Sequence, residues 1–277
     1  MQNELFELYK KRFGEKFTSN LSNSGKFEID FSKDFVCDSP NKCKECDASK
    51  FRQDLPFWLK NIEKTFMLIS QDAGKSKIVS DKERDDDFNT VFSIHQVLLN
   101  KEKYLSDGKH NNYYRYLSAL VPDNFIENTF FTDLIKCSYS TNGSIKIDDC
   151  KCKNDILTEI KFVKPKVVFL FGAKPRDSFK KIIKEFTNIP VQINTDETFS
   201  LKINKGKIIK ISIFRHDYFL DKIFLFVPQL GNNRFSKKCF DDLLDLIKNK
   251  ITPAINLHLD KNNLIFQGLQ MDQNKNL

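Results

Sequence analysis

The chain has 277 residues, of which 40% are hydrophobic, 30% are charged and 27 are phenylalanine, so it can bury a substantial core beneath a charged surface. No stretch approaches the roughly 18 uninterrupted apolar residues of a membrane span, and the N-terminus lacks an apolar signal region, so we expect a cytoplasmic protein with no membrane partner. The formal net charge of +8 and the pI near 9.0 permit a polyanionic partner but do not identify one.

In the N-terminal half, apolar residues at helical spacing predict four helices, at residues 2–18, 51–64, 89–100 and 113–120. The polar stretch 19–50 has little periodicity and carries three cysteines. A hydrophobic strand is expected at 66–70, with a charged loop at 75–87. We therefore expect an N-terminal appendage, residues 1–50, attached to an α/β domain, residues 51–277, in one compact monomeric unit.

In the C-terminal half, strands alternate with helices, which is typical of an α/β fold. A βαβ-like core is expected at 130–172, followed by a helix at 175–186 with a proline in its first turn. Short strands are expected within 190–213, around the turn NKGK. A last strand at 223–227 then leads to a helix at 236–250.

Three hydrophobic strands in this order end in polar or glycine-bearing turns. They read FMLISQDAG from Phe66, TFFTDLIKC from Thr129 and IFLFVPQLGNNR from Ile223. Ligands of an open parallel sheet bind beyond the carboxyl ends of its strands. We therefore expect the three ends, which carry Asp72, Asp133 and Gln229, to converge on one site.

These motifs, taken in order, resemble the uracil-DNA glycosylase superfamily, and most closely its iron–sulfur branch. SQDAG at 70–74 looks like the first catalytic motif, FFTDLIKC stands where the branch has a strand ending in T-N before K-C, and VPQLGNNR occupies the place of the H-P-S loop. The strand PKVVFLFG also matches. The resemblance covers most of residues 43–234. It implies a three-layer fold with a central, mainly parallel four-stranded sheet flanked by helices.

The seven cysteines are an odd number in a chain without a secretory signal, so metal ligation is favoured over disulfides. A C-x-x-C pair supplies two ligands, and distant segments must complete a site of four. The set proposed is Cys43, Cys46, Cys137 and Cys152, with Cys37 or Cys150 as substitutes. The resemblance implies a [4Fe–4S] cluster, whereas the residues alone equally permit zinc or free buried thiols. Cys239 is expected in the core.

Cleavage of a base from deoxyribose passes through an oxocarbenium-like sugar, which a nearby carboxylate stabilises. Asp72 is the candidate for this role and for positioning water; its alternative role is a turn or helix cap. Gln71 and the backbone near Gly74 are candidates for binding the base carbonyl or the water, since glycine allows close approach.

Asp133 stands where the uracil-reading families have asparagine. An amide offers a donor and an acceptor to uracil, whereas an ionised carboxylate only accepts. Asp133 therefore suits the exocyclic amine of a cytosine-type base, together with a protonated N3. The alternative is that Asp133 caps a turn.

The third motif departs from the family because Val227 stands in place of its histidine. Gln229, Asn232 or Asn233 are candidates for a neutral donor to the base. His216 is expected to be an ordinary loop residue.

The following loop resembles the family's DNA-penetrating loop, with an apolar wedge and basic phosphate contacts. The DNA-binding candidates are Leu230, Asn233, Arg234 and Lys237. Phe88 is a candidate for stacking on the flipped base, and the segment NNYYRY at 111–116 for further DNA contact. The alternatives are a plain strand-to-helix turn and aromatic core packing.

The sequence thus predicts a DNA glycosylase that flips a nucleotide and leaves an abasic site, acting on a cytosine-type or modified base, including hypermodified phage cytosine, rather than on plain uracil. The alternative is a non-catalytic nucleic-acid-binding protein that keeps the fold. The absence of a G-x-G-x-x-G or Walker pattern argues against a doubly wound dinucleotide or triphosphate enzyme.

Overall fold

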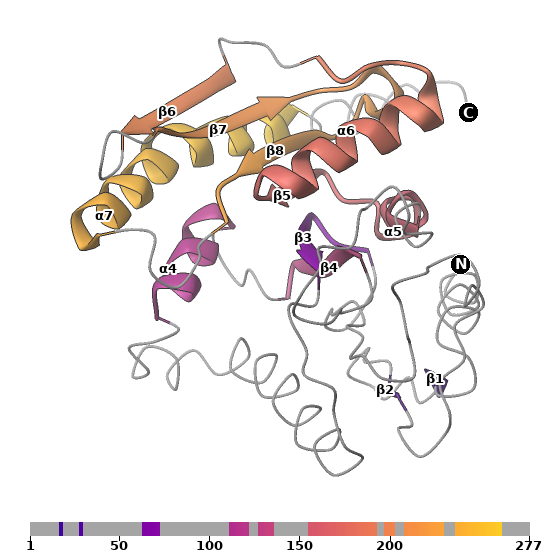
Figure 1. The fold of residues 1–277 in the computed structure, drawn as a ribbon, viewed down its shortest axis with the longest axis horizontal. Coiled ribbons are helices and arrows are strands. Elements are labelled where there is room, and N and C mark those ends of the chain that lie inside the picture. The colour runs from indigo at the N-terminus through magenta and orange to yellow at the C-terminus, as the bar shows by residue number, and fades with distance from the viewer. Residues whose placement is uncertain are drawn as a thin grey trace, which may run out of the picture.

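The computed structural model describes residues 17–18, 28–29, 63–72, 111–121, 127–135, 155–192, 197–202, 208–229 and 236–261. Over these residues the chain forms an α/β structure in which a six-stranded mixed sheet has helices on both faces (Figure 1). The α/β class predicted from the sequence is confirmed. A separate two-stranded antiparallel pair joins β1 (Phe17–Thr18) to β2 (Glu28–Ile29).

The sheet has the strand order β4-β3-β5-β8-β7-β6. Its strands are β3 (Phe66–Asp72), β4 (Thr129–Ile135), β5 (Val167–Phe171), β6 (Thr198–Lys202), β7 (Ile208–Phe214) and β8 (Ile223–Val227). The first four strands in this order are parallel, β7 is antiparallel to β8, and β6 is antiparallel to β7. The expected four-stranded sheet is therefore wrong in strand number, because the β6–β7 hairpin joins the edge of β8 and extends the sheet.

Helices cover the sheet in two layers. On one face lie α4 (Asn111–Leu120) and α7 (Lys237–Leu246), and α7 continues through the π-helical segment η7 (Ile247–Ile251) into a helix at 252–261. On the other face lie α5 (Asp155–Val163) and α6 (Ala173–Thr187). Figure 1 shows α6 and α7 on opposite sides of β8.

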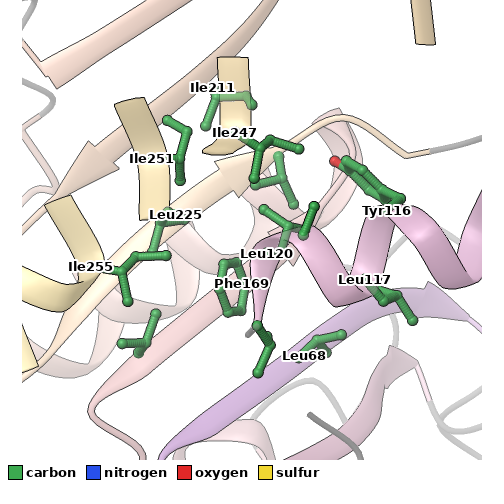
Figure 2. Packing of buried hydrophobic residues seen from close by; sticks show 14 of the residues in the cluster. Leu68, Tyr116, Leu117, Leu120, Phe169, Ile211, Leu225, Ile247, Ile251 and Ile255 are labelled. Atoms are coloured by element: carbon green, nitrogen blue, oxygen red, sulfur yellow. The ribbon is translucent and has the colours of Figure 1, made fainter. Parts of the chain in front are cut away.

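The core is divided by the sheet into two clusters, because successive strand side chains point to opposite faces. Leu68, Phe169 and Leu225 belong to the cluster under α4 and α7. Figure 2 shows them packed against Leu120 and Ile251 of the covering helices. Met67, Val168 and Phe224 belong to the cluster under α5 and α6. All five residues of β5 and of β8 are buried, as expected of parallel strands covered on both faces.

Several predicted boundaries shift. Phe17 and Thr18 form a strand at the end of the predicted helix 2–18. Residues 63–64, at the end of the predicted helix 51–64, are not helical, and the rest of that predicted helix lies outside the described residues. The helix predicted at 236–250 continues to residue 261. It accommodates Pro253, which lacks an amide and crowds the preceding turn, next to the π-turn, where the amide of Thr252 donates to the carbonyl of Ile247. The predicted helix 89–100 lies outside the described residues.

Candidate functional site at the carboxyl edge of the parallel strands

The carboxyl ends of the four parallel strands lie along one edge of the sheet. In the register of β3 and β4, Ser70 pairs with Asp133 and Asp72 pairs with Ile135. The two aspartates predicted from the sequence therefore occupy neighbouring strands, with their backbone positions two residues apart in register. The structure describes Gln71 and Asp72 through their backbone in β3 alone.

Ser70 and Asp133 lie on the sheet face that α4 covers. Leu68 belongs to the core cluster of that face and Phe131 packs against it. Residues two apart on a strand share a face, so Ser70 follows Leu68 and Asp133 follows Phe131. Both Ser70 and Asp133 are half-buried, so the strand ends leave them partly open to solvent.

Gly172 brings the ends of β5 and β8 together. Its amide donates to the carbonyl of Val227 at 2.8 Å, and its φ of 95° and ψ of 173° are a backbone conformation essentially confined to glycine. A Cβ atom here would lie 3.3 Å from both Cβ and Oε1 of Gln229. The exposed Gln229 is thus held against the start of α6, at the same edge as Asp133. Gly172 was not among the predicted site residues. The sequence feature that could have indicated it is a glycine between a buried strand and a helix.

Tyr116 of α4 fixes the turn that carries Gln229. The Tyr116 hydroxyl donates to the carbonyl of Pro228 at 2.8 Å, and the ring packs edge-on against Phe171, with centroids 6.0 Å apart. Tyr116 is fully buried, so this residue of the candidate DNA-contact segment 111–116 packs in the core instead. Arg115 instead pairs with Asp241 of α7 at 3.1 Å and lies 5.3 Å from the ring centroid of Phe240.

Val227 is apolar, and its side chain is buried in the core cluster under α7. It therefore supplies no polar group to this edge. Neither histidine in the described part of the chain replaces the absent one. His216 lies before β8, at the opposite end of that strand, where its Nδ1 accepts from the amide of Tyr218 and its Nε2 donates to the carbonyl of Ile189, both at 3.2 Å. The ring of His258 is hydrogen-bonded to the backbone of Lys166 and Asp221, which precede β5 and β8.

The first turn of α7 brings Lys237 to the carboxyl edge. Ser236 caps this helix by accepting a hydrogen bond from the amide of Cys239 at 3.3 Å. Lys237 and Lys238 follow directly and are exposed. Cys239 is buried, so its predicted place in the core is confirmed.

The remaining predicted residues lie outside the described part of the chain. They are the four proposed metal ligands Cys43, Cys46, Cys137 and Cys152, their substitutes Cys37 and Cys150, and Gly74, Phe88, Leu230, Asn232, Asn233 and Arg234. Within the described residues, no three side chains of histidine, cysteine, aspartate or glutamate are grouped closely enough to hold a metal ion. Nor is any helix among them long and apolar enough to cross a bilayer.

A buried polar contact missed by sequence reasoning lies beneath β4. Thr132 donates to Oε2 of Glu159 on α5 at 2.9 Å, and both residues are buried. Glu159 lies at the helical spacing of the apolar residues of α5, which was the signal available. Thr132 alternates with Asp133 along the strand, so this contact belongs to the α5 face and ties β4 to α5 rather than forming part of the edge site.

No known protein-family model matches the sequence, and no curated protein matches it either. The residues at the carboxyl edge are therefore the basis for inferring a function.

Proposed function

We propose that this protein is a DNA glycosylase that hydrolyses the N-glycosidic bond of a flipped nucleotide and leaves an abasic site. The observation that carries the proposal is the parallel register of β3 and β4. In this register Asp72 pairs with Ile135, which is two residues after Asp133 on β4. Gln229, held against Gly172, borders the same edge. One ligand at this edge can therefore meet groups from β3, β4 and β8 together.

The proposed fold is of the uracil-DNA glycosylase type. Four parallel strands with helices on both faces agree with the architecture that the sequence resemblance implies. The β6–β7 hairpin is then an addition to that sheet.

In the proposed reaction, the Asp72 carboxylate stabilises positive charge developing on the sugar and orients the attacking water. The bond from the anomeric carbon to the base breaks, and its electron pair leaves with the base. The water oxygen bonds to the anomeric carbon and gives up a proton to solvent or to a carboxylate. Glycosidic cleavage generally uses carboxylates in these roles.

Asp133 sets the proposed base preference. Its carboxylate can accept from the exocyclic amine of cytosine and from a protonated N3, which also makes the base a better leaving group. Uracil would instead turn a carbonyl oxygen toward the carboxylate. A cytosine-type base, unmodified or carrying the modifications of phage DNA, is therefore the proposed substrate.

The proposed cofactor is a [4Fe–4S] cluster on Cys43, Cys46, Cys137 and Cys152, with zinc as the alternative. Four thiolates are a donor set that fits either group. The cluster would supply cross-linking between the N-terminal segment and the sheet. Broad visible absorption, with about four iron and four sulfide per chain, would distinguish it from zinc.

The test is base release from duplexes that carry one uracil, cytosine, hydroxymethylcytosine or glucosylated cytosine, followed by alkali to break abasic sites. We expect release from a cytosine-type substrate, and a loss of roughly a hundredfold or more in Asp72→Asn. The exposed Asp217, which begins a short helix before β8, offers a matched control, and Asp217→Asn should keep full activity. Release from uracil alone would overturn the base assignment.

A second variant tests the reading of the base directly. Asp133→Asn restores a donor, so the ratio of uracil to cytosine cleavage should rise by about tenfold to a hundredfold, which corresponds to the roughly 1–3 kcal/mol of a mismatched hydrogen bond. An unchanged ratio would mean that another residue reads the base.

The burial of Val227 in the core favours one alternative, a nucleic-acid-binding protein without catalysis. This alternative predicts that the parent protein and Asp72→Ala bind DNA equally well and that neither releases any base of the panel.

A further inference from the structure

The β6–β7 hairpin has one apolar face and one polar face. Phe199, Leu201 and Ile209 pack against the core cluster under α7. The alternate positions form the other face, which we call the polar hairpin face: Thr198, Ser200, Lys202, Ile208, Lys210 and Ser212. Ser200, Lys202 and Lys210 are exposed. The hairpin therefore turns hydroxyl and ammonium groups to solvent on the side of the sheet that α6 covers further along.

The polar hairpin face is continuous with the flank of α6. Across the sheet, Thr198 pairs with Ser212 and Ser212 pairs with Phe226 of β8, and the Thr198 and Ser212 hydroxyl oxygens lie 3.1 Å apart. Lys180 of α6 places its ammonium group 5.4 Å from the ring centroid of Phe226. One row thus runs from a lysine on the helix across to two hydroxyl groups on the hairpin.

The lysines of the hairpin lie at the carboxyl edge. Because β7 is antiparallel to β8, its first residues extend beyond Val227, where β8 ends. Lys210 is two residues before Ser212, and it pairs with Ser200 while Lys202 pairs with Ile208. This is the edge at which Gly172 starts α6 and Gln229 is held.

The combined surface is positively charged. The first turn of α6 contains no acidic residue, and Arg176 is paired with the adjacent Asp177 at 2.7 Å. Burial and the neighbouring Arg176 lower the pKa of Lys180. Within the described residues, Lys202 and Lys210 have no carboxylate partner. An anion bound here would therefore reduce the electrostatic repulsion among the positive charges of Lys180, Lys202 and Lys210.

We propose that the polar hairpin face, together with the flank of α6 that carries Arg176 and Lys180, binds the sugar–phosphate backbone of a nucleic acid strand beside the base site. Lysine ammonium and serine hydroxyl groups are common donors to phosphate oxygens. Strand residues two apart repeat at about 6.6–6.8 Å, which gives regularly spaced donors for a regularly spaced polyanion. The identity of the polyanion rests on the proposed function, whereas the location of the surface rests on the hairpin.

The test compares two double variants with the same change in charge. Lys202→Gln with Lys210→Gln alters the polar hairpin face. Lys248→Gln with Lys250→Gln alters two exposed lysines of η7, on the opposite face of the sheet, and is the control. Binding of a labelled random-sequence oligonucleotide, single-stranded and duplex, is measured by fluorescence anisotropy over a series of salt concentrations. Circular dichroism checks that both variants fold.

We expect the hairpin variant to bind on the order of tenfold more weakly, with a salt slope smaller by about 1.4 for a single strand or about 1.8 for a duplex, as for the loss of two phosphate contacts. The control variant should match the parent protein. Equal weakening in both variants would show that only the net charge of the protein matters, and would overturn the proposal. Unchanged binding in the hairpin variant would also overturn it. Binding to heparin but not to either oligonucleotide would show that the partner is a different polyanion.

These outcomes are separable from those of the base-release assay. If the protein releases no base but the hairpin variant loses oligonucleotide binding, the catalytic proposal fails and the binding surface stands. If base release is found but both variants bind like the parent protein, the binding surface fails alone.

Discussion

Gly172 links the fold to the candidate site at the level of a single residue. It ends β5, begins α6 and contacts Gln229, and its amide ties it to Val227 at the end of β8. The positive φ of Gly172 and the close approach of Gln229 both disfavour any residue with a side chain at position 172. A substitution there should therefore disturb stability and the edge site together.

Gly172→Ala should lower the free energy of unfolding by about 1–3 kcal/mol, which is the cost of holding a non-glycine residue in such a conformation. Urea unfolding followed by circular dichroism measures the change. The double variant Gly172→Ala with Gln229→Gly removes both atoms of Gln229 that a Cβ at position 172 would crowd, Cβ and Oε1, but leaves the backbone strain. We expect the double variant to stay destabilised relative to Gln229→Gly, and full recovery would show that crowding is the whole cause.

Residue-level prediction from the sequence succeeded where one motif determined the position. Asp133 and Gln229 were placed at strand ends because each follows an apolar run, and both are at the carboxyl edge. Gly172 was missed because its contact partner is 57 positions away (229 minus 172). The burial of Tyr116, at the end of the candidate DNA-contact segment 111–116, could not be predicted, because an aromatic residue in a polar segment resembles a surface residue until the core around it is known.

At the scale of the element, the helix that begins as α7 starts at a capping serine and continues past a proline to residue 261. The side chain of Ser236 accepts from the amide of Cys239, which satisfies one of the free amides of the first turn. The helix shares a core cluster with residues of β8 and β7, and the Thr252 hydroxyl donates to the carbonyl of Ala119 at the end of α4 at 3.1 Å.

Ser236→Ala should lower the free energy of unfolding by about 1 kcal/mol through the loss of this cap. Ser236→Asp should retain most of the stability, because aspartate caps well and also favours the positive end of the helix. Thermal or urea unfolding of the two variants checks the order. An equal loss in both would mean that the hydroxyl, rather than capping as such, is required.

The elements themselves were largely readable from the sequence. Apolar runs gave β3, β4, β5 and β8, and the proline-led helix became α6. Membership of the β6–β7 hairpin in the sheet was not readable, because pairing of Ser212 with Phe226 is a tertiary contact and the hairpin has only one apolar face. The extension of the last helix was missed because Pro253 normally ends a helix, and the π-turn that absorbs it has no sequence signature.

For the whole molecule, a charged cluster closes the amino edge of the sheet, opposite the candidate site. Lys166 and Lys222 pair with Asp221 at 3.2 Å and 2.9 Å. His258, from the C-terminal helix, is bonded to the backbone of Lys166 and Asp221. This cluster joins the starts of β5 and β8 to the end of the last helix.

The pKa of His258 is lowered from its ordinary value of 6.5, chiefly by burial and also by Arg215, although the two backbone hydrogen bonds act in the opposite direction. The folded protein thus binds a proton at His258 less readily than the unfolded chain. The contribution to stability is therefore complete above the unfolded pKa and is lost as pH falls from about 6.5 toward the lower folded value.

His258→Gln should flatten the dependence of stability on pH in this window. Urea midpoints of parent and variant, compared between about pH 8 and about pH 5.5, measure the difference. Asp221 does not interfere: burial alone would raise its pKa, but Lys222 and Lys166 lower it below 3.8. Its contribution is lost only at more acidic pH. A parent profile as flat as that of the variant would exclude His258 as the cause.

The pairing of β3 has a consequence for synthesis of the chain. Phe66 pairs with Thr129 on one side and with Val167 on the other, so the first partner is made 63 residues later (129 minus 66) and the second 101 residues later (167 minus 66). At translation rates of about 5–20 residues per second, the strand waits about 3–13 seconds for the first of them. During that interval the apolar run FMLI exists without either of its neighbouring strands, so the sheet cannot begin to assemble around it.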